Sequence, residues 1–266
     1  MRLPRLAAVL VASLGVSVVP GLLPGLAPGL AANLGAGPAL ADFSDAERAA
    51  IRAEVRGFLL ENPDILREML ALLETSEREG QAGSDREMIA AEAGRLFDDG
   101  FSHVGGNPEG SFVLVEFVDY ECGFCRRAHP DVQALIDGDG DIRLITKEFP
   151  ILGPGSDLAA RAAIATLMTE GGDAYEWLGD ALMTSGGRVT EASLEDTLED
   201  LGLDAARIRA AMADEEVTRR IAETRSLAQA LCIAGTPTFV FGDRMVRGYL
   251  PLADMQSLVD EIRGEG

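Results

Sequence analysis

Cys122 and Cys125 are the residues best suited to chemistry, because two thiols at this spacing can close a small disulfide ring and open it again. They follow an apolar run at 112–118, which predicts a buried strand ending where a helix begins. The first cysteine would lie at the helix N-terminus, where unpaired N–H groups and the helix dipole stabilise a thiolate. We therefore expect Cys122 to be the nucleophile and Cys125, one turn further on, to be the resolving thiol.

The neighbours of Cys122 influence the pKa of its thiol. Gly123 and Phe124 carry no imidazole or hydroxyl group, so the thiolate would depend mainly on backbone N–H groups. Two arginines that follow the cysteine pair would lower this pKa, and two acids that precede it would raise it. We expect a depressed pKa, within the range of about 3.5–7.5 known for such sites but above its lower end.

The same pair of thiols could instead hold a metal ion or form a structural bridge. Two thiolates can bind Cu(I) or supply half of a zinc site, but the chain has no second such pair and only two histidines, His103 and His129. A bridge that closes so short a loop adds little stability. We favour redox catalysis, with copper binding by the same thiolates as the alternative. We expect no resident metal and no cofactor beyond the redox-active Cys122–Cys125 disulfide.

Glu116 interrupts the apolar run six positions before Cys122. Its carboxyl either faces solvent or lies buried beneath the cysteines, and the sequence leaves both arrangements open. In the buried arrangement, a raised pKa would allow Glu116 to relay a proton to Cys125.

A second loop, Gly235-Thr236-Pro237, could hold a peptide against the cysteines. A proline that opens a strand is a common place for a cis peptide bond, although most X-Pro bonds are trans. Its missing N–H leaves a neighbouring backbone group free to pair with an extended substrate. We expect the substrate to contact Thr236 and Pro237, together with Gly123 and Phe124.

Four other side chains receive structural interpretations. We expect Cys232 to be a buried, inert thiol, with redox involvement or an intermolecular bridge as the alternatives. His129 is interpreted as a surface or packing residue. Tyr175 and Trp177 are interpreted as core residues of a helical insertion.

Residues 1–41 are predicted to be a signal peptide. Arg2 and Arg5 form a positive n-region, 6–19 is apolar, and 39–41 provides a small-residue cleavage site. An uncleaved membrane anchor is the alternative, but three prolines interrupt a run already shorter than about 20 apolar residues. The sequence therefore predicts export to the periplasm, where disulfides persist.

The net charge is −21, from 23 basic and 44 acidic side chains. Nucleic acids and anionic membranes bind through basic patches, so the composition argues against both as partners. Three cysteines in 266 residues do not make a structural disulfide scaffold.

Residues 42–100 are predicted to be helical. Ser44 and Glu47 fit a capping box, Pro63 opens a second helix, and a polar break at 80–83 precedes a third helix that ends near Phe97. The apolar stripes of this segment are too short to form a core alone. They must pack on the rest of the chain or on copies of it, and the preference for self-association depends on the resemblance described below.

The remaining residues, 101–266, predict an α/β domain. Its predicted order is a loop at 105–110, a strand at 112–118, a helix from 123 to about 136, a strand at 142–146, several helices within about 156–231, a hairpin at 238–246 and a helix at 251–262. This order predicts a thioredoxin-like fold with an inserted helical domain, preceded by the N-terminal helical segment.

Three motifs in order resemble the DsbA-family thiol–disulfide oxidoreductases, in the branch of Com1-like periplasmic proteins. They are Glu116-Phe117-x-Asp119-Tyr120-x-Cys122-Gly123-Phe124-Cys125, Glu148-Phe149-Pro150-Ile151-Leu152-Gly153 and Gly235-Thr236-Pro237-Thr238-Phe239. The resemblance covers about 112–263. It implies a thioredoxin fold with inserted helices, a catalytic Cys122/Cys125 pair, a cis Pro237 and a buried Glu116.

The segment at 58–66 is similar to the extra N-terminal segment of suppressor-of-copper-sensitivity (ScsC) proteins, some of which trimerise and act as disulfide isomerases. The chain departs from the best-known DsbA pattern, with Gly-Phe where Pro-His is common between the cysteines. The resemblance therefore implies a thiol–disulfide oxidoreductase, either an oxidase or an isomerase. Its expected partners are cysteine-containing exported proteins, a membrane redox partner and further copies bound through 42–100 as a dimer or trimer.

Overall fold

The computed structural model describes residues 43–265, so the predicted signal peptide at 1–41 lies outside the described residues. The chain divides into two compact units, one up to Ile65 and one from Leu66 onward. Within 43–265, no helix has the length and apolar character needed to cross a membrane.

The first unit contains helix α1 (Asp45–Glu61) and the first turn of α2 (Pro63–Ala91). Ser44 and Glu47 form the predicted capping box, in which the Ser44 N–H donates to the Glu47 carboxylate at 2.8 Å. Pro63 opens α2 as predicted. No residue of α1 is buried, and its apolar stripe at Ile51, Val55 and Phe58 is exposed.

Helix α2 continues without interruption to Ala91, so the predicted polar break at 80–83 is wrong. Each glycine in a helix costs only about 1 kcal/mol relative to alanine, which favourable neighbours can offset. The C-terminal half of α2 is held by packing of Ile89 in the core and by Asp85, whose carboxylate accepts two 2.8 Å hydrogen bonds from Arg247.

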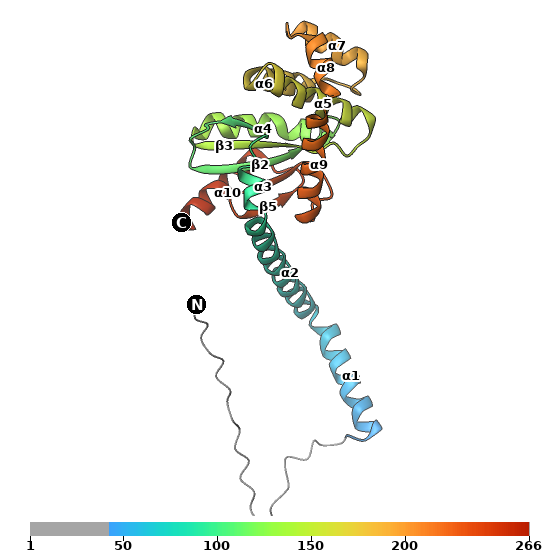
Figure 1. Ribbon diagram of the computed structural model, residues 1–266. Coiled ribbons are helices and arrows are strands. Elements are labelled where there is room, and N and C mark those ends of the chain that lie inside the picture. The colour runs from blue at the N-terminus through green and yellow to red at the C-terminus, as the bar shows by residue number, and fades with distance from the viewer. Residues whose placement is uncertain (1–42, 266) are drawn as a thin grey trace, which may run out of the picture. The chain divides into compact units, whose positions relative to one another are not determined.

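A five-stranded mixed sheet lies at the centre of the second unit, in the order β1-β3-β2-β4-β5 (Figure 1). The central strand β2 runs parallel to β3, and the other neighbours are antiparallel. The strands are β1 (His103–Gly106), β2 (Phe112–Val118), β3 (Ile142–Glu148), β4 (Thr238–Phe241) and β5 (Arg244–Arg247).

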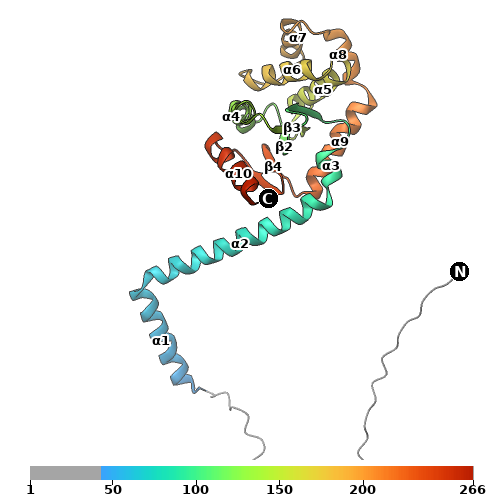
Figure 2. The ribbon, with the colours of Figure 1, turned by 90° about the vertical axis from the view of Figure 1, so that its left-hand side faces the viewer.

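Helices cover both faces of this sheet (Figure 2). Helices α4 (Gly123–Asp139) and α10 (Leu252–Glu265) pack on one face, against Leu114 of β2. The end of α2, with α3 (Ala93–Phe97) and α9 (Glu215–Ala230), packs on the other, against Val115 and Phe117. Because successive side chains of a strand alternate, Glu116 projects to the α4 face.

Strand β1 was not predicted, because Gly105 and Gly106 indicated a loop. The strand pairs antiparallel with β3, with His103 opposite Thr146. Gly106 has a φ of 65°, and a Cβ there would lie 2.6 Å from the Ile142 carbonyl oxygen. A glycine is therefore required by close packing within the strand and does not mark a loop.

The helical insertion lies between β3 and β4, and its core also includes Val118, Tyr120, Cys122 and Cys125. Its helices are α5 (Pro154–Thr169), α6 (Gly172–Thr184), α7 (Glu191–Asp200) and α8 (Ala205–Met212), followed by α9. Tyr175 belongs to this core as predicted, but Trp177 is 56% exposed, so its assignment to the core is wrong. Two residues that are two positions apart on a helix face nearly opposite directions. Both could not enter the same core.

Candidate active site

Cys122 is the N-cap residue of α4, with φ −74° and ψ 116°. Its N–H donates to the Asp119 carbonyl oxygen at 3.0 Å, and its own carbonyl accepts the Arg126 N–H at 3.0 Å. Cys125 is fully buried one turn further on, and the two cysteines are not joined by a disulfide bond. The structure thus confirms that the pair lies at the junction of a strand and a helix.

The two thiols have opposite acidities. Interaction with the Cys125 thiol, and then with Thr236 and the N–H groups of Cys125 and Phe124, outweighs the effect of burial and lowers the pKa of Cys122 to about 5. The same interaction with Cys122, together with burial, raises the pKa of Cys125. The arrangement therefore provides one ready thiolate and one thiol that stays protonated.

The loop before β4 lies against this pair. The Thr236–Pro237 peptide bond is cis. The Cys122 thiol donates to the Thr236 carbonyl oxygen at 3.1 Å, and the Thr238 hydroxyl donates to the Gly235 carbonyl oxygen at 2.8 Å. Two segments more than a hundred residues apart in the chain thus meet at one sulfur atom.

Glu116 is buried, with 6% of its surface exposed, so the buried one of its two predicted arrangements is the observed one. Desolvation, and then the nearby Glu148 carboxylate, raise the pKa of Glu116 to about 8. Its charge in turn contributes to the raised pKa of Cys125. A carboxyl that exchanges its proton near neutral pH therefore lies close enough to Cys125 to influence it.

Asp119, between β2 and the cysteines, has a role that the sequence did not reveal. Its carboxylate accepts the Glu121 N–H at 2.9 Å, the Ile151 N–H at 2.8 Å and the Leu152 N–H at 3.1 Å. It fixes the active-site loop to the loop after β3. In the sequence, the only indication of this role is that Asp119 lies three positions before Cys122.

A buried cluster around Glu148 was also missed. The hydroxyls of Tyr120 and Tyr175 donate to the same Glu148 oxygen, at 2.8 and 2.6 Å, and the other oxygen has no partner within 43–265. Burial raises the pKa of Glu148 to about 7. The cluster ties the active-site loop to the helical insertion through Tyr175.

The outer surface beside Cys122 is apolar. Phe124 is 61% exposed, and Ile151 and Leu152 on the neighbouring loop are exposed too. Arg126, one of the two arginines expected to lower the Cys122 pKa, instead donates to the carbonyl oxygens of Tyr120 and Gly187 at 2.8 and 2.7 Å.

Cys232 is exposed, so its expected burial is wrong. It follows α9 in the left-handed conformation, with a φ of 53°, where the chain turns out of the helix. The His129 Nε2–H donates to the Asp180 carboxylate at 2.9 Å. Residues 43–265 contain no group of three or more His, Cys, Asp or Glu side chains that could hold a metal ion.

Two family models match this chain. One describes DSBA-like thioredoxin domains and matches residues 113–260. The other describes the N-terminal domain of copper resistance protein ScsC and matches residues 47–79.

Solved structures show the same likeness. A thioredoxin-like oxidoreductase from Silicibacter pomeroyi is 42% identical in sequence, with a TM-score of 0.61. The match covers 64% of this chain and 97% of the oxidoreductase chain. A linker-deletion variant of Proteus mirabilis ScsC is 26% identical with a TM-score of 0.65, covering 85% of this chain and 100% of its own.

Among curated proteins, the Na(+)/H(+) antiporter NhaA 1 of Salinispora arenicola is 34% identical over 150 residues, which are 55% of this chain and 22% of the antiporter. The chain spans about a fifth to a quarter of the length of the curated relatives it matches.

Proposed function

Because this chain belongs to the family of DSBA-like thioredoxin domains, whose fold supports thiol–disulfide exchange, we propose that it is a periplasmic protein disulfide oxidoreductase working through Cys122 and Cys125. The observation that carries the proposal is the position of the Cys122 sulfur. Cys122 is the N-cap residue of α4, and its sulfur has a pKa of about 5 and lies 3.1 Å from the Thr236 carbonyl oxygen beside the cis Pro237. A thiolate is therefore available at neutral pH where an extended peptide can approach.

The reaction transfers two electrons through a mixed disulfide. The Cys122 thiolate attacks one sulfur of a substrate disulfide, forms a Cys122–substrate bond and releases the other substrate sulfur as a thiolate. Cys125 then loses its proton and attacks Cys122, which forms the Cys122–Cys125 disulfide and releases the second substrate thiolate. The substrate gains two electrons in this direction, and the reverse sequence oxidises it.

Glu116 is the proposed acceptor of the Cys125 proton. Cys125 is buried and its pKa is raised, so its attack on the mixed disulfide needs a nearby base. With a pKa of about 8, Glu116 can take this proton during the reaction and return it to solvent later. Glu116 thereby links the release of substrate to pH.

The proposed clients are exported proteins that contain cysteine. The exposed ring of Phe124 and the half-exposed Ile151 and Leu152 offer an apolar surface that suits unfolded peptide segments. Gly123 leaves the approach to Cys122 open, since nothing lies within 4 Å of where its Cβ would be. Thr236 and Pro237 would hold the peptide backbone on the other side of the sulfur.

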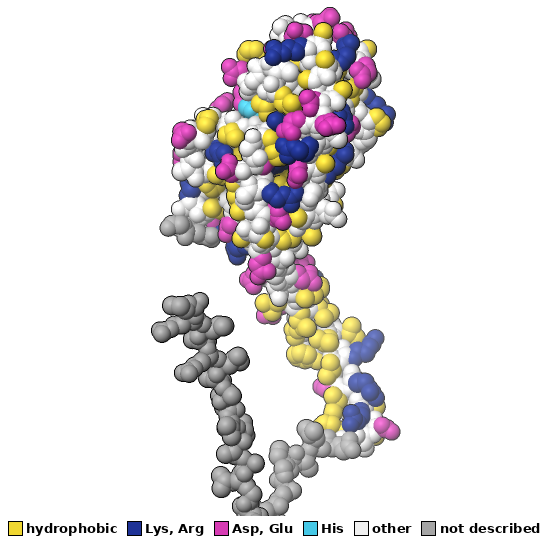
Figure 3. Space-filling model, viewed as in Figure 1, with side chains coloured by type: hydrophobic (Ala, Val, Ile, Leu, Met, Phe, Trp, Pro, Cys, Tyr) yellow, Lys and Arg dark blue, Asp and Glu magenta, His cyan; other side chains and the backbone are white. Residues whose placement is uncertain are grey.

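The apolar faces of α1 and of the first half of α2 are proposed to bind further copies of this chain, as a dimer or trimer. Figure 3 shows hydrophobic side chains gathered over these helices. They are the exposed residues Ile51, Val55, Phe58, Leu60, Leu66, Met69, Leu70, Leu72 and Leu73. Monomeric proteins rarely expose so many large apolar side chains on a helix. The family model that describes the ScsC N-terminal domain matches this same segment, at residues 47–79.

Self-association would favour isomerase activity, because several active sites could then act on one substrate. An isomerase must be kept reduced, and an oxidase must be reoxidised, so either activity requires a membrane redox partner. A glutathione titration of the Cys122–Cys125 pair tests the direction: an easily reduced bond indicates an oxidase. Failure of the pair to exchange with glutathione at all would contradict the proposed function.

A copper-handling role for the same two thiolates is the second candidate. The match of residues 47–79 to a domain named for copper resistance favours it. Two sulfurs at this spacing suit Cu(I). Tight stoichiometric Cu(I) uptake, with neither oxidation nor reduction of a model peptide, would replace the first proposal by this one.

A further inference from the structure

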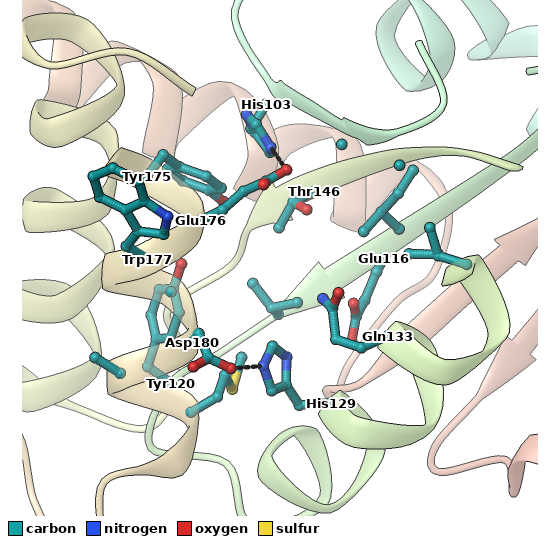
Figure 4. Close-up of a pocket in the computed structure, with 18 of the residues that line it drawn as sticks. His103, Glu116, Tyr120, His129, Gln133, Thr146, Tyr175, Glu176, Trp177 and Asp180 are labelled. Atoms are coloured by element: carbon teal, nitrogen blue, oxygen red, sulfur yellow. Dashed lines mark hydrogen bonds and ion pairs between the residues drawn. The ribbon is translucent and has the colours of Figure 1, made fainter. Parts of the chain in front are cut away.

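A cavity of about 410 Å³ lies on the α4 face of the sheet (Figure 4). Residues of β1, β2 and β3 line it from the sheet, and residues of α4 and α6 line it from the sides. Its volume falls within the range of about 300–1,000 Å³ that is typical of small-molecule sites. Neither Phe124 nor the loop around Pro237 lines it, so it is separate from the surface proposed to bind clients.

Glu116 is an unpartnered carboxyl aimed into this cavity. Its side chain lines the cavity although only 6% of the residue is exposed. No group within residues 43–265 donates a hydrogen bond to it, and no Lys or Arg of that part of the chain pairs with it. A buried carboxyl without a donor is costly, and a partner of opposite charge is the strongest compensation available.

The rest of the lining has a negative character. Glu176 and Asp180 lie at its edge, hydrogen-bonded to His103 and His129 at 2.9 Å each. No Lys or Arg belongs to the described lining. The cavity therefore disfavours anions and attracts cations.

The wall opposite Glu116 is aromatic. Figure 4 shows Tyr120, Tyr175 and Trp177 on the side of α6, with Glu116 and Gln133 across the cavity from them. Aromatic faces attract cations and also provide an apolar surface for a flat organic body. A hydrated inorganic ion would use neither property.

We propose that this cavity binds a small organic cation, an ammonium or amidinium group carried on an apolar or aromatic body, with Glu116 as its counter-ion. The amidinium or ammonium N–H groups donate to the Glu116 carboxylate, and the body packs against Tyr120 and Trp177. The site goes beyond the proposed exchange of disulfides and needs neither thiol.

Benzamidine is a suitable probe, because it joins an amidinium to one aromatic ring. The chain has a single tryptophan, so its indole N–H signal in a ¹H–¹⁵N NMR spectrum reports on Trp177 without further assignment. The reduced full chain is titrated with benzamidine at a pH above the Glu116 pKa of about 8. We expect a saturable shift of this signal, and a much smaller one with benzamide, the neutral molecule of the same shape.

The Glu116→Gln variant keeps the shape and removes the charge. We expect it to bind benzamidine at least about tenfold more weakly, because one charge-assisted hydrogen bond is lost. The matched variant Glu199→Gln, on the exposed surface of α7, should bind as the unaltered chain does. No saturable shift, or equal binding of benzamide and benzamidine by the unaltered chain, would overturn the proposal. Disulfide exchange is not involved in this measurement, so its failure leaves the proposed function standing.

Discussion

The sulfur of Cys122 lies 3.1 Å from the carbonyl oxygen of Thr236, although 114 positions separate the two residues. The helix that Cys122 caps and the loop that contains Thr236 are delivered by the neighbouring strands β2 and β4. The antiparallel pairing of these strands is therefore what assembles the site. A change that loosens this pairing should harm exchange even when both cysteines are intact.

The Cys122 thiol should lose its proton at a much lower pH than the thiol of an ordinary cysteine. Its pKa is lowered from 9.0 to about 5, so folding of the dithiol form favours the ionised sulfur. The resulting stabilisation is complete above pH 9 and is lost as the pH falls towards 5. Thiolate absorbance measured against pH should show a step near 5 that Cys122→Ser removes. A single step near 9 would contradict this acidity.

Glu116 should destabilise the protein at high pH. Its pKa is raised from 4.5 to about 8, so the folded state holds a proton that the unfolded state has released. Stability should therefore fall as the pH rises from 4.5 to 8, by up to about 5 kcal/mol from this group. Urea unfolding of Glu116→Gln should show a clearly flatter fall over that interval. The same fall in both proteins would mean that Glu116 is not the group responsible.

Asp119→Ala should weaken the junction between the active-site loop and the loop after β3. Three N–H groups would lose a charged acceptor, at a cost of about 3 kcal/mol. Amide hydrogen exchange should accelerate at Ile151 and Leu152, whose N–H groups Asp119 binds. The control Asp137→Ala, on the exposed side of α4, should leave both amides and the stability unchanged.

Val55→Asp should abolish self-association, because it places a charge in the apolar stripe of α1. Sedimentation of the full exported chain should show a dimer or trimer that this variant converts to a monomer. Ala53→Asp, on the opposite side of the same helix, is the matched control and should leave the assembly intact. A monomeric unaltered chain would contradict the proposed role of α1. Truncation at residue 100 is unsuitable, since Ile89 and Leu96 belong to the core of the second unit.

The elements that carry the thiols could be predicted, because their signals are local. The apolar run of β2, the Cys-x-x-Cys pair and the hairpin of β4 and β5 each have a distinct period or spacing. The side of the sheet on which Glu116 lies also follows from alternation with Leu114. Its burial does not, because it depends on α4 and α6 coming from elsewhere to cover that face.

Other features were predicted wrongly or missed because they also depend on the folded structure around them. Gly105 and Gly106 were predicted to form a loop, but close packing places Gly106 in a strand. Gly80 was predicted to break a helix, but it lies within α2 because one glycine costs a helix too little to end it. Cys232 was assigned to the core on residue type alone, whereas the left-handed turn after α9 directs it outward. The hydrogen bonds of Asp119 and Glu148 join segments about 30 residues apart, and no local pattern encodes such contacts.

The most direct test of the proposed chemistry uses the Cys125→Ser variant and a peptide that contains one disulfide bond. Without the resolving thiol, the Cys122 thiolate should capture one peptide per chain and hold it as a stable mixed disulfide. Mass spectrometry of the digested product locates the adduct, and the exposed Cys232 thiol is a built-in competitor. The account predicts an adduct on Cys122. An adduct on Cys232 with Cys122 unmodified, or no adduct at all, would contradict it.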